Sequence, residues 1–331
     1  MRHVIPGITA ATYAAHRLHD LERAWPETNC YVDLLIEVLS AAGHEPAAAL
    51  GFTLAQDFEG DQFTFFKFPT GDLATLYGLE IQELAIFDRL EDHIGVQIDR
   101  GRLPLVEFDA FHLPDTEGVS YRIAHTKTTV AVNAIDPVRR RMGYFHNAGY
   151  FELEGEDYAA LFADRAAQTG LPLFPYSEFV KFDRTAAASD PVETSLSLLR
   201  HHAARRPAEN PVGAYRAVFD AHMAALADRP PDYFHAYAFN TLRQLGANFE
   251  LLQSHLAWLG ENGVTGLDTA GAQAGTIANG AKTMQFKLAR AMARRRFDGL
   301  GDTLDPLVTA YDRLTASLDL ALSDTRSSRA A

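Results

Sequence analysis

The pattern of apolar residues changes character near residue 185, and this change limits the folds that the chain can adopt. Before it, short runs rich in Val, Thr and Phe are interspersed with stretches of helical spacing. After it, nearly every segment has helical periodicity, and the segments are separated by breaks rich in Pro and Gly. Mixed signals followed by helices alone favour an α+β domain and a separate helical domain. We therefore expect an α+β domain at 1–185 and an α-helical domain at 186–331.

Length and charge exclude several classes of protein. The chain has 331 residues, which is enough for two domains with cores of their own. Its net charge of −13 disfavours a general nucleic-acid-binding protein, which needs a basic face. We expect no membrane span, because no uninterrupted apolar stretch approaches ~18 residues. A single cysteine and an N-terminus without the apolar run of a signal peptide predict a cytoplasmic protein.

The only cysteine, Cys30, lies at the start of a predicted helix. Apolar residues recur at helical spacing from Tyr31 to Ala42, and Thr28 or Asn29 can cap this helix. The helix dipole and the free backbone N–H groups of a helix start favour a thiolate, so Cys30 is a candidate nucleophile. The alternative is a buried and inert thiol, which is common for a lone cysteine.

A cysteine nucleophile needs a base, and the base needs a residue that orients it. Among the 13 histidines, His125 lies near the start of a predicted strand at 122–135, which is a rigid position for a base. Asn147 lies on the next predicted strand, at 142–153, where its side-chain oxygen could accept the imidazole N–H. Cys, His and Asn in this order predict a papain-like catalytic triad.

Two further expectations concern an oxyanion site and a metal site. The backbone N–H of Cys30 and the Asn29 side chain could hold the oxyanion of an acyl-transfer reaction. No pair of histidines has metal-ligand spacing with a third ligand, so we expect no metal.

The stretch 108–114, followed by His125 at the head of a strand, resembles the N-terminal domain of the butirosin-biosynthesis acyltransferase family. The chain also resembles a bacterial family encoded near stand-alone amino acid:carrier-protein ligases. The resemblance implies a papain-like domain followed by a helical region. It implies transfer of an acyl or aminoacyl group from a carrier protein, through a Cys30 thioester, to an amine or hydroxyl. The donor would be the carrier's phosphopantetheine arm, with no cofactor bound directly.

The third member of the triad stays open, because the family commonly has Asp-Pro where Asn147 stands in this chain. Asp136 and His146 are the alternatives to Asn147. Asp109 and His112 could line the cleft.

Local basic clusters occur in this acidic chain, among them Arg139, Arg140 and Arg141. Such a cluster could bind the acidic helix of a carrier protein, or it could be solvated surface. The expected partners are thus an acyl or aminoacyl carrier protein and a small-molecule acceptor, with no nucleic acid and no membrane. Two alternatives to the transferase remain: a papain-like cysteine peptidase or amidase, and a non-catalytic binding protein with a buried cysteine.

Overall fold

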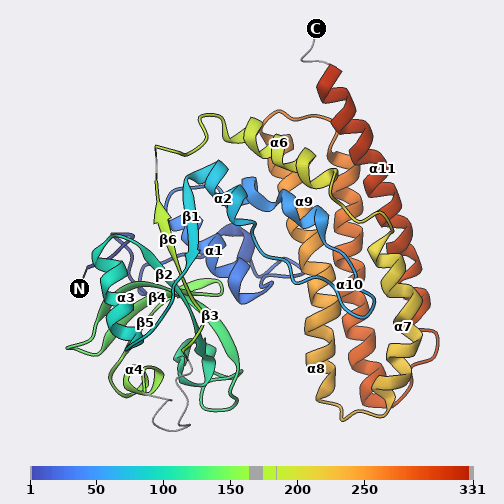
Figure 1. Cartoon of the computed structure of the whole chain (residues 1–331). Coiled ribbons are helices and arrows are strands. Elements are labelled where there is room, and N and C mark those ends of the chain that lie inside the picture. The colour runs from blue at the N-terminus through green and yellow to red at the C-terminus, as the bar shows by residue number, and fades with distance from the viewer. Residues whose placement is uncertain (1, 164–173, 184, 328–331) are drawn as a thin grey trace. The chain divides into compact units, whose positions relative to one another are not determined.

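The computed structural model describes residues 2–163, 174–183 and 185–327, and the chain forms two compact units (Figure 1). The first unit comprises Met1–Arg17, Asn29–Pro46 and Leu73–Ala188. The second comprises Leu18–Thr28, Ala47–Asp72 and Ser189–Ala331. The chain therefore contributes two N-terminal segments to the second unit before it builds that unit's long helices. The mixed α+β content that the sequence predicts is confirmed.

Six antiparallel strands form one sheet in the first unit, in the order β1-β6-β2-β3-β4-β5. Its central strands, β2 and β3, pair so that Asp109 lies opposite Lys127. This register brings the end of β2 beside the start of β3. The strands are β1 (Leu79–Glu83), β2 (Leu103–Asp109), β3 (Lys127–Asp136), β4 (Arg141–His146), β5 (Gly149–Glu154) and β6 (Ser177–Phe182).

Helices cover both faces of this sheet. Helix α1 contacts β3 and β4, and its first residue, Cys30, meets Thr129 on β3. Helices α3 and α4 pack in a core that contains Val130. Because Thr129 and Val130 are neighbours on one strand, they point to opposite faces, so α1 lies on one face and α3 and α4 on the other. The helices of this part of the chain are η1 (Arg17–His19), α1 (Cys30–Ala41), η2 (Pro46–Ala55), α2 (Thr70–Tyr77), α3 (Leu90–Asp99), η3 (Ala110–His112), η4 (Pro114–Thr116) and α4 (Gly155–Leu161).

Two strand predictions need correction around the expected catalytic residues. The strand expected at 142–153 is two strands, β4 and β5, joined by a tight turn. Asn147 lies in that turn with a φ of 45°, a left-handed conformation that Asn adopts more readily than most residues. The other strand begins at Lys127 rather than at 122, so His125 lies in the connection just before β3.

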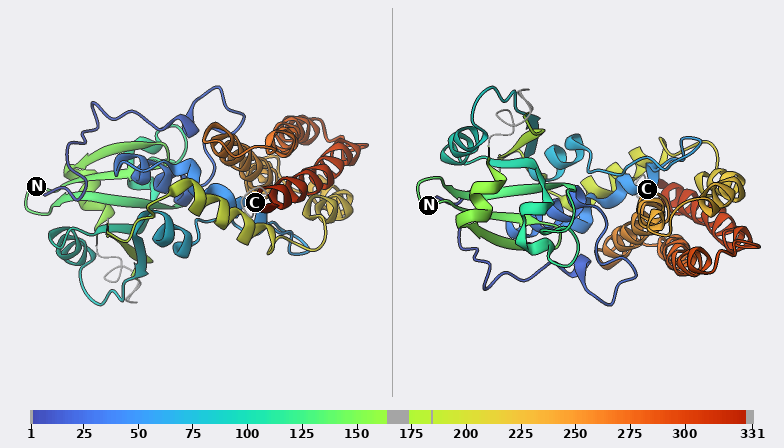
Figure 2. Two further views of the ribbon diagram at one scale, coloured as in Figure 1. Left: turned by 90° about the horizontal axis from the view of Figure 1, so that it is seen from above. Right: turned by 90° about the horizontal axis from the view of Figure 1, so that it is seen from below.

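The second unit is helical, and its long helices pack side by side (Figure 2). Helix α10 contacts both α9 and α11, and α11 contacts α7. Asp190 and Asn210 cap α6 and α7, and each is followed by Pro at the first helical position. None of the helices in the described ranges has the length and apolarity to cross a membrane. The elements are α6 (Pro191–Ala203), α7 (Pro211–Ala227), α8 (Tyr233–Ala238), the π-helix η5 (Phe239–Arg243), α9 (Gln244–Glu261), α10 (Asp268–Arg294), η6 (Gly301–Thr303) and α11 (Asp305–Ser327).

The core of the second unit contains a buried histidine that makes stability depend on pH. His255 on α9 is fully buried, and its Nδ1 donates to the Ala47 carbonyl oxygen at 2.8 Å. Burial lowers the pKa of His255 to about 4, and the nearby His202 adds to the effect. Between pH 6.5 and 4 the unfolded chain therefore binds a proton at this position that the folded chain does not bind. This contribution to stability is present above pH 6.5 and is lost as the pH falls.

We expect the change from pH 7 to pH 5 to remove about 2 kcal/mol of unfolding free energy through this residue alone. His255→Asn keeps an N–H donor near Ala47 but does not titrate. Urea unfolding of both proteins at the two pH values should show a smaller loss in the variant. The same loss in both proteins would contradict the assignment.

Candidate functional site

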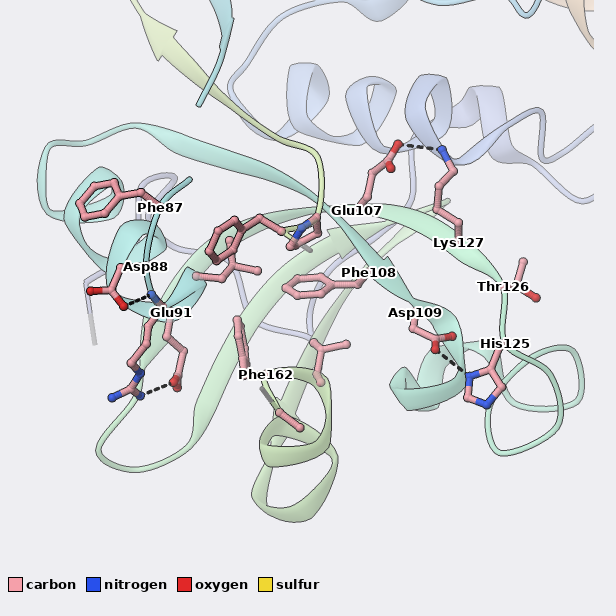
Figure 3. A pocket seen from close by; sticks show the side chains of 16 residues that line it. Phe87, Asp88, Glu91, Glu107, Phe108, Asp109, His125, Thr126, Lys127 and Phe162 are labelled. Carbon is pink, nitrogen blue, oxygen red and sulfur yellow. Dashed lines mark hydrogen bonds and ion pairs between the residues drawn. The ribbon is translucent and has the colours of Figure 1, made fainter. Parts of the chain in front are cut away.

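His125 is held in place by two neighbours. Its Nδ1 lies 2.7 Å from Oδ2 of Asp109, at the end of β2 (Figure 3), and its ring stacks on Phe111 at a centroid distance of 4.4 Å. The other oxygen of Asp109 accepts the Phe111 backbone N–H at 3.1 Å, which orients the carboxylate. An ionised carboxylate only accepts hydrogen bonds, so Nδ1 of a neutral His125 carries the proton and Nε2 is the free base. The side chain is 72% exposed, so a ligand can reach the imidazole.

A buried network holds the connection that carries His125 against the sheet. Asp115, in this connection, accepts a hydrogen bond from the Tyr144 hydroxyl and pairs with Nδ1 of His146. Nε2 of His146 lies 2.7 Å from the Thr128 hydroxyl on β3. Burial, and then the charge of Asp115, raises the pKa of Tyr144, so its hydroxyl remains a donor. Because Thr128 lies on β3 and Tyr144 and His146 lie on β4, the network ties the connection to β3 and β4.

A cavity of about 840 Å³ is lined by His125 and its partner carboxylate. Phe108 and Phe162 form an aromatic wall, with their ring centroids 5.3 Å apart and nearly perpendicular. Phe87 and Phe174 also line the cavity, although 78% and 43% of their surfaces are exposed. In Figure 3, Phe108 lies between Glu91 and the Asp109–His125 pair. The volume is within the ordinary range of small-molecule sites, roughly 300–1,000 Å³.

The thiol of Cys30 contacts β3 and not a histidine. Its Sγ lies 3.9 Å from the Thr129 hydroxyl, which is its one hydrogen-bond contact among the described residues. His125 precedes Thr129 by four residues, about 13 Å of extended chain. Phe108 belongs to the core under α3 and α4, on the face opposite α1. Side chains alternate along β2, so Asp109, the partner of His125, lies on the same face of the sheet as Thr129 and Cys30, whereas Phe108, which also lines the cavity, lies on the opposite face.

Three of the other predicted site residues, His146, Asp136 and His112, make contacts of their own. His146 is buried in the network described above, and Asn147 lies in the β4–β5 turn, so His125 pairs with Asp109 rather than with Asn147. The carboxylate of Asp136 accepts the Arg139 backbone N–H at 3.0 Å, and this bond lowers its pKa. His112 packs against the ring of Phe111.

Asn29 is the N-cap of α1. Its Oδ1 accepts the Val32 backbone N–H at 3.0 Å, and the residue is buried. The side-chain oxygen therefore serves the helix, and the oxyanion role of Asn29 stays a prediction. Within the described part of the chain, no group of three or more His, Cys, Asp or Glu side chains could hold a metal ion.

In the basic cluster, Arg139 and Arg140 lie in the β3–β4 turn, and Arg141 begins β4, at the end of β3 remote from His125. Arg139 forms an ion pair with Asp136, and Arg141 pairs with two glutamates of β5. The ten residues of β3 span about 30 Å between this cluster and His125. Both observations weaken the cluster as a docking surface for a ligand that must reach His125.

Sequence reasoning missed Thr129, Asp115 and Phe111, and it assigned Asp109 to the cleft without a partner. A signal for Asp109 was present. Consecutive strands often pair, so the last residue of one strand and the first residue of the next come close together. The predicted third members of the triad all follow His125 in the chain, whereas its partner precedes it.

The buried network gives a test of how the connection is held. Asp115→Ala leaves the buried groups of Tyr144 and His146 without their carboxylate partner. We expect a loss of about 3 kcal/mol of unfolding free energy in urea. Asp302→Ala, which removes an exposed carboxylate, should cost less than about 1 kcal/mol. Equal small losses in the two variants would show that the network does not hold the connection.

Both halves of the chain match domains of a known family. Residues 14–182 match the DUF1839 N-terminal domain, and residues 188–320 match the DUF1839 C-terminal domain. No curated protein matches the chain. The matches do not link the chain to papain-like acyltransferases. Because the two domain matches cover most of its length, the chain belongs to the DUF1839 family.

Proposed function

We propose that the chain transfers an acyl or aminoacyl group from the phosphopantetheine thioester of a carrier protein to an amine or hydroxyl acceptor. One observation carries the proposal: an imidazole base, oriented by Asp109, lines a cavity of small-molecule size. The thioester donor comes from the resemblance to butirosin-biosynthesis acyltransferases. A papain-like relationship of the first unit is likewise part of the proposal.

The chemistry uses His125 as general base. Its Nε2 takes a proton from the acceptor nitrogen or oxygen while that atom bonds to the thioester carbonyl carbon. The carbon–sulfur bond then breaks, and the imidazolium returns the proton to the leaving sulfur. The products are an amide or ester and a free carrier thiol, so no redox partner is needed. Asp109 keeps the imidazole in the required tautomer and stabilises the imidazolium.

A second route passes through a thioester on Cys30. It is favoured by the place of Cys30 as the first residue of α1, where the residue is partly exposed. The Cys30 sulfur would attack the donor carbonyl and lose its proton, the carbon–sulfur bond to the carrier would break to release the protonated carrier thiol, and the acceptor would then displace Cys30. This route requires a rearrangement, because the thiol contacts Thr129 and not a base. With water as acceptor, the same route would describe a cysteine peptidase or amidase.

Substitutions separate the two routes. In the direct route, His125→Asn should lower kcat by about 10²–10⁴-fold, because the general base is lost. Asp109→Asn should also lower kcat, whereas Cys30→Ala should retain transfer. The assay incubates acyl-loaded carrier protein with a panel of amines and alcohols and measures products by mass spectrometry. Transfer from none of the thioesters, or full activity of His125→Asn, would refute the proposal.

The intermediate provides an independent measurement. We expect the intact mass of wild-type protein, quenched in acid during turnover, to show no acyl group on Cys30. Loss of activity in Cys30→Ala together with an acyl adduct in the wild type would replace the direct route by the covalent one. Hydrolysis of peptides or amides without a thioester donor would assign the chain to the peptidase or amidase class. If the Cys30 thiol is inert to alkylation and no substrate is turned over, the remaining interpretation is a non-catalytic binding protein.

A further inference from the structure

We infer that the acceptor is a primary amine on an apolar, preferably aromatic, body, and that it binds in the cavity beside His125. The role of this amine as the acceptor rests on the proposed function, because the chemistry at His125 defines that role. The binding of the amine is argued from the cavity alone. Two independent features support it: the aromatic lining and the sign of the charges.

The aromatic lining provides space for an apolar body. Phe108 and Phe162 contact each other edge to face, and Phe108 is nearly fully buried. Phe87 and Phe174 line the same cavity with much of their ring surfaces in solvent. Large exposed apolar side chains gathered at a cavity mark a surface that a ligand covers. A phenyl ring or a short alkyl chain would bury these rings and gain about 25 cal/mol per Å² of apolar surface.

The charged groups at the cavity leave an excess of negative charge. Lys127 and Glu107 neutralise one another, with Nζ of Lys127 2.7 Å from Oε1 of Glu107. Among the residues that the structure describes, the remaining charged side chains that line the cavity are three carboxylates and one guanidinium: Asp88, Glu91, Asp109 and Arg89.

This balance discriminates between ligand classes. Arg89 already pairs with Glu91 at 2.8 Å, so its charge is not free for a ligand anion. A carboxylate or phosphate would therefore approach like charges with no free cation among the described lining residues, whereas an ammonium is attracted. Asp109 is the carboxylate next to His125, so the attraction brings the ligand nitrogen to the base. The same placement serves the reaction. The bound ammonium first loses one proton to solvent through the exposed His125 imidazole, and the neutral amine then loses a second proton to Nε2 as it attacks the thioester carbonyl.

The test measures binding without turnover, by calorimetric titration of the full chain with 2-phenylethylamine at neutral pH. Ethylamine tests the contribution of the ring, and phenylacetate tests the charge. We expect 2-phenylethylamine to bind at least about tenfold more tightly than either comparison ligand. Absence of 2-phenylethylamine binding, or equal binding of phenylacetate, overturns the inference.

Two variants locate the site. Phe87→Ala removes an exposed ring from the cavity and should weaken 2-phenylethylamine binding several-fold. Phe286→Ala removes an equally large exposed ring from α10 in the second unit and should leave binding unchanged. Equal effects of the two substitutions would show that the amine binds elsewhere.

A third variant separates this inference from the proposed function. His125→Asn should bind 2-phenylethylamine but should not transfer an acyl group to it. Retained binding in a protein that transfers from no thioester would refute the transferase and support the amine site. Transfer to acceptors without an apolar body, at rates that Phe87→Ala leaves unchanged, would refute the amine site and support the transferase.

Discussion

The register between β2 and β3 is the constraint on which the candidate site depends. It places Asp109 opposite Lys127, so the carboxylate that ends β2 reaches the imidazole that precedes β3. A shift of one residue would turn Asp109 to the other face of the sheet and break the pair. The register is itself fixed by burial, because Val106 and Val130, which lie opposite each other, both belong to the core under α3 and α4. Packing of apolar side chains thus sets the geometry of the polar pair.

The thiol and the imidazole occupy different positions along the chain around β3. Cys30 starts α1 next to Thr129, and His125 precedes Thr129 by four residues, about 13 Å of extended chain. A papain-like mechanism needs the thiol and the imidazole in contact, whereas direct attack on a thioester needs only the oriented base and a place for the acceptor. The arrangement therefore favours the direct route. The buried bonds of Asp115 keep the connection before β3 in place for that role.

Much of the architecture could be predicted from periodicity. The change near residue 185, the helix that begins at Cys30 and the long helices of the second unit follow from apolar spacing and from caps such as Asp190 and Asn210. The pairing of His125 could not be read in the same way, because it depends on which strands are neighbours. Asn147 lies in a turn of two residues. Helical or strand periodicity does not indicate turns, so the position of Asn147 could not be predicted from it. Sequence order predicted a triad, while the fold brings together residues that order alone does not connect.

The tautomer of His125 tests the central claim most directly, because Asp109 should hold the proton on Nδ1 and leave Nε2 as the base. Proton–nitrogen correlation spectra of protein labelled with ¹⁵N-histidine distinguish the two ring nitrogens, and the His125→Asn spectrum identifies the signals of His125. We predict a protonated Nδ1 and an unprotonated Nε2 in neutral His125, with this preference lost in Asp109→Asn. A neutral His125 that carries its proton on Nε2 in the wild-type protein would contradict the role of Asp109 and, with it, that of Nε2 as the base.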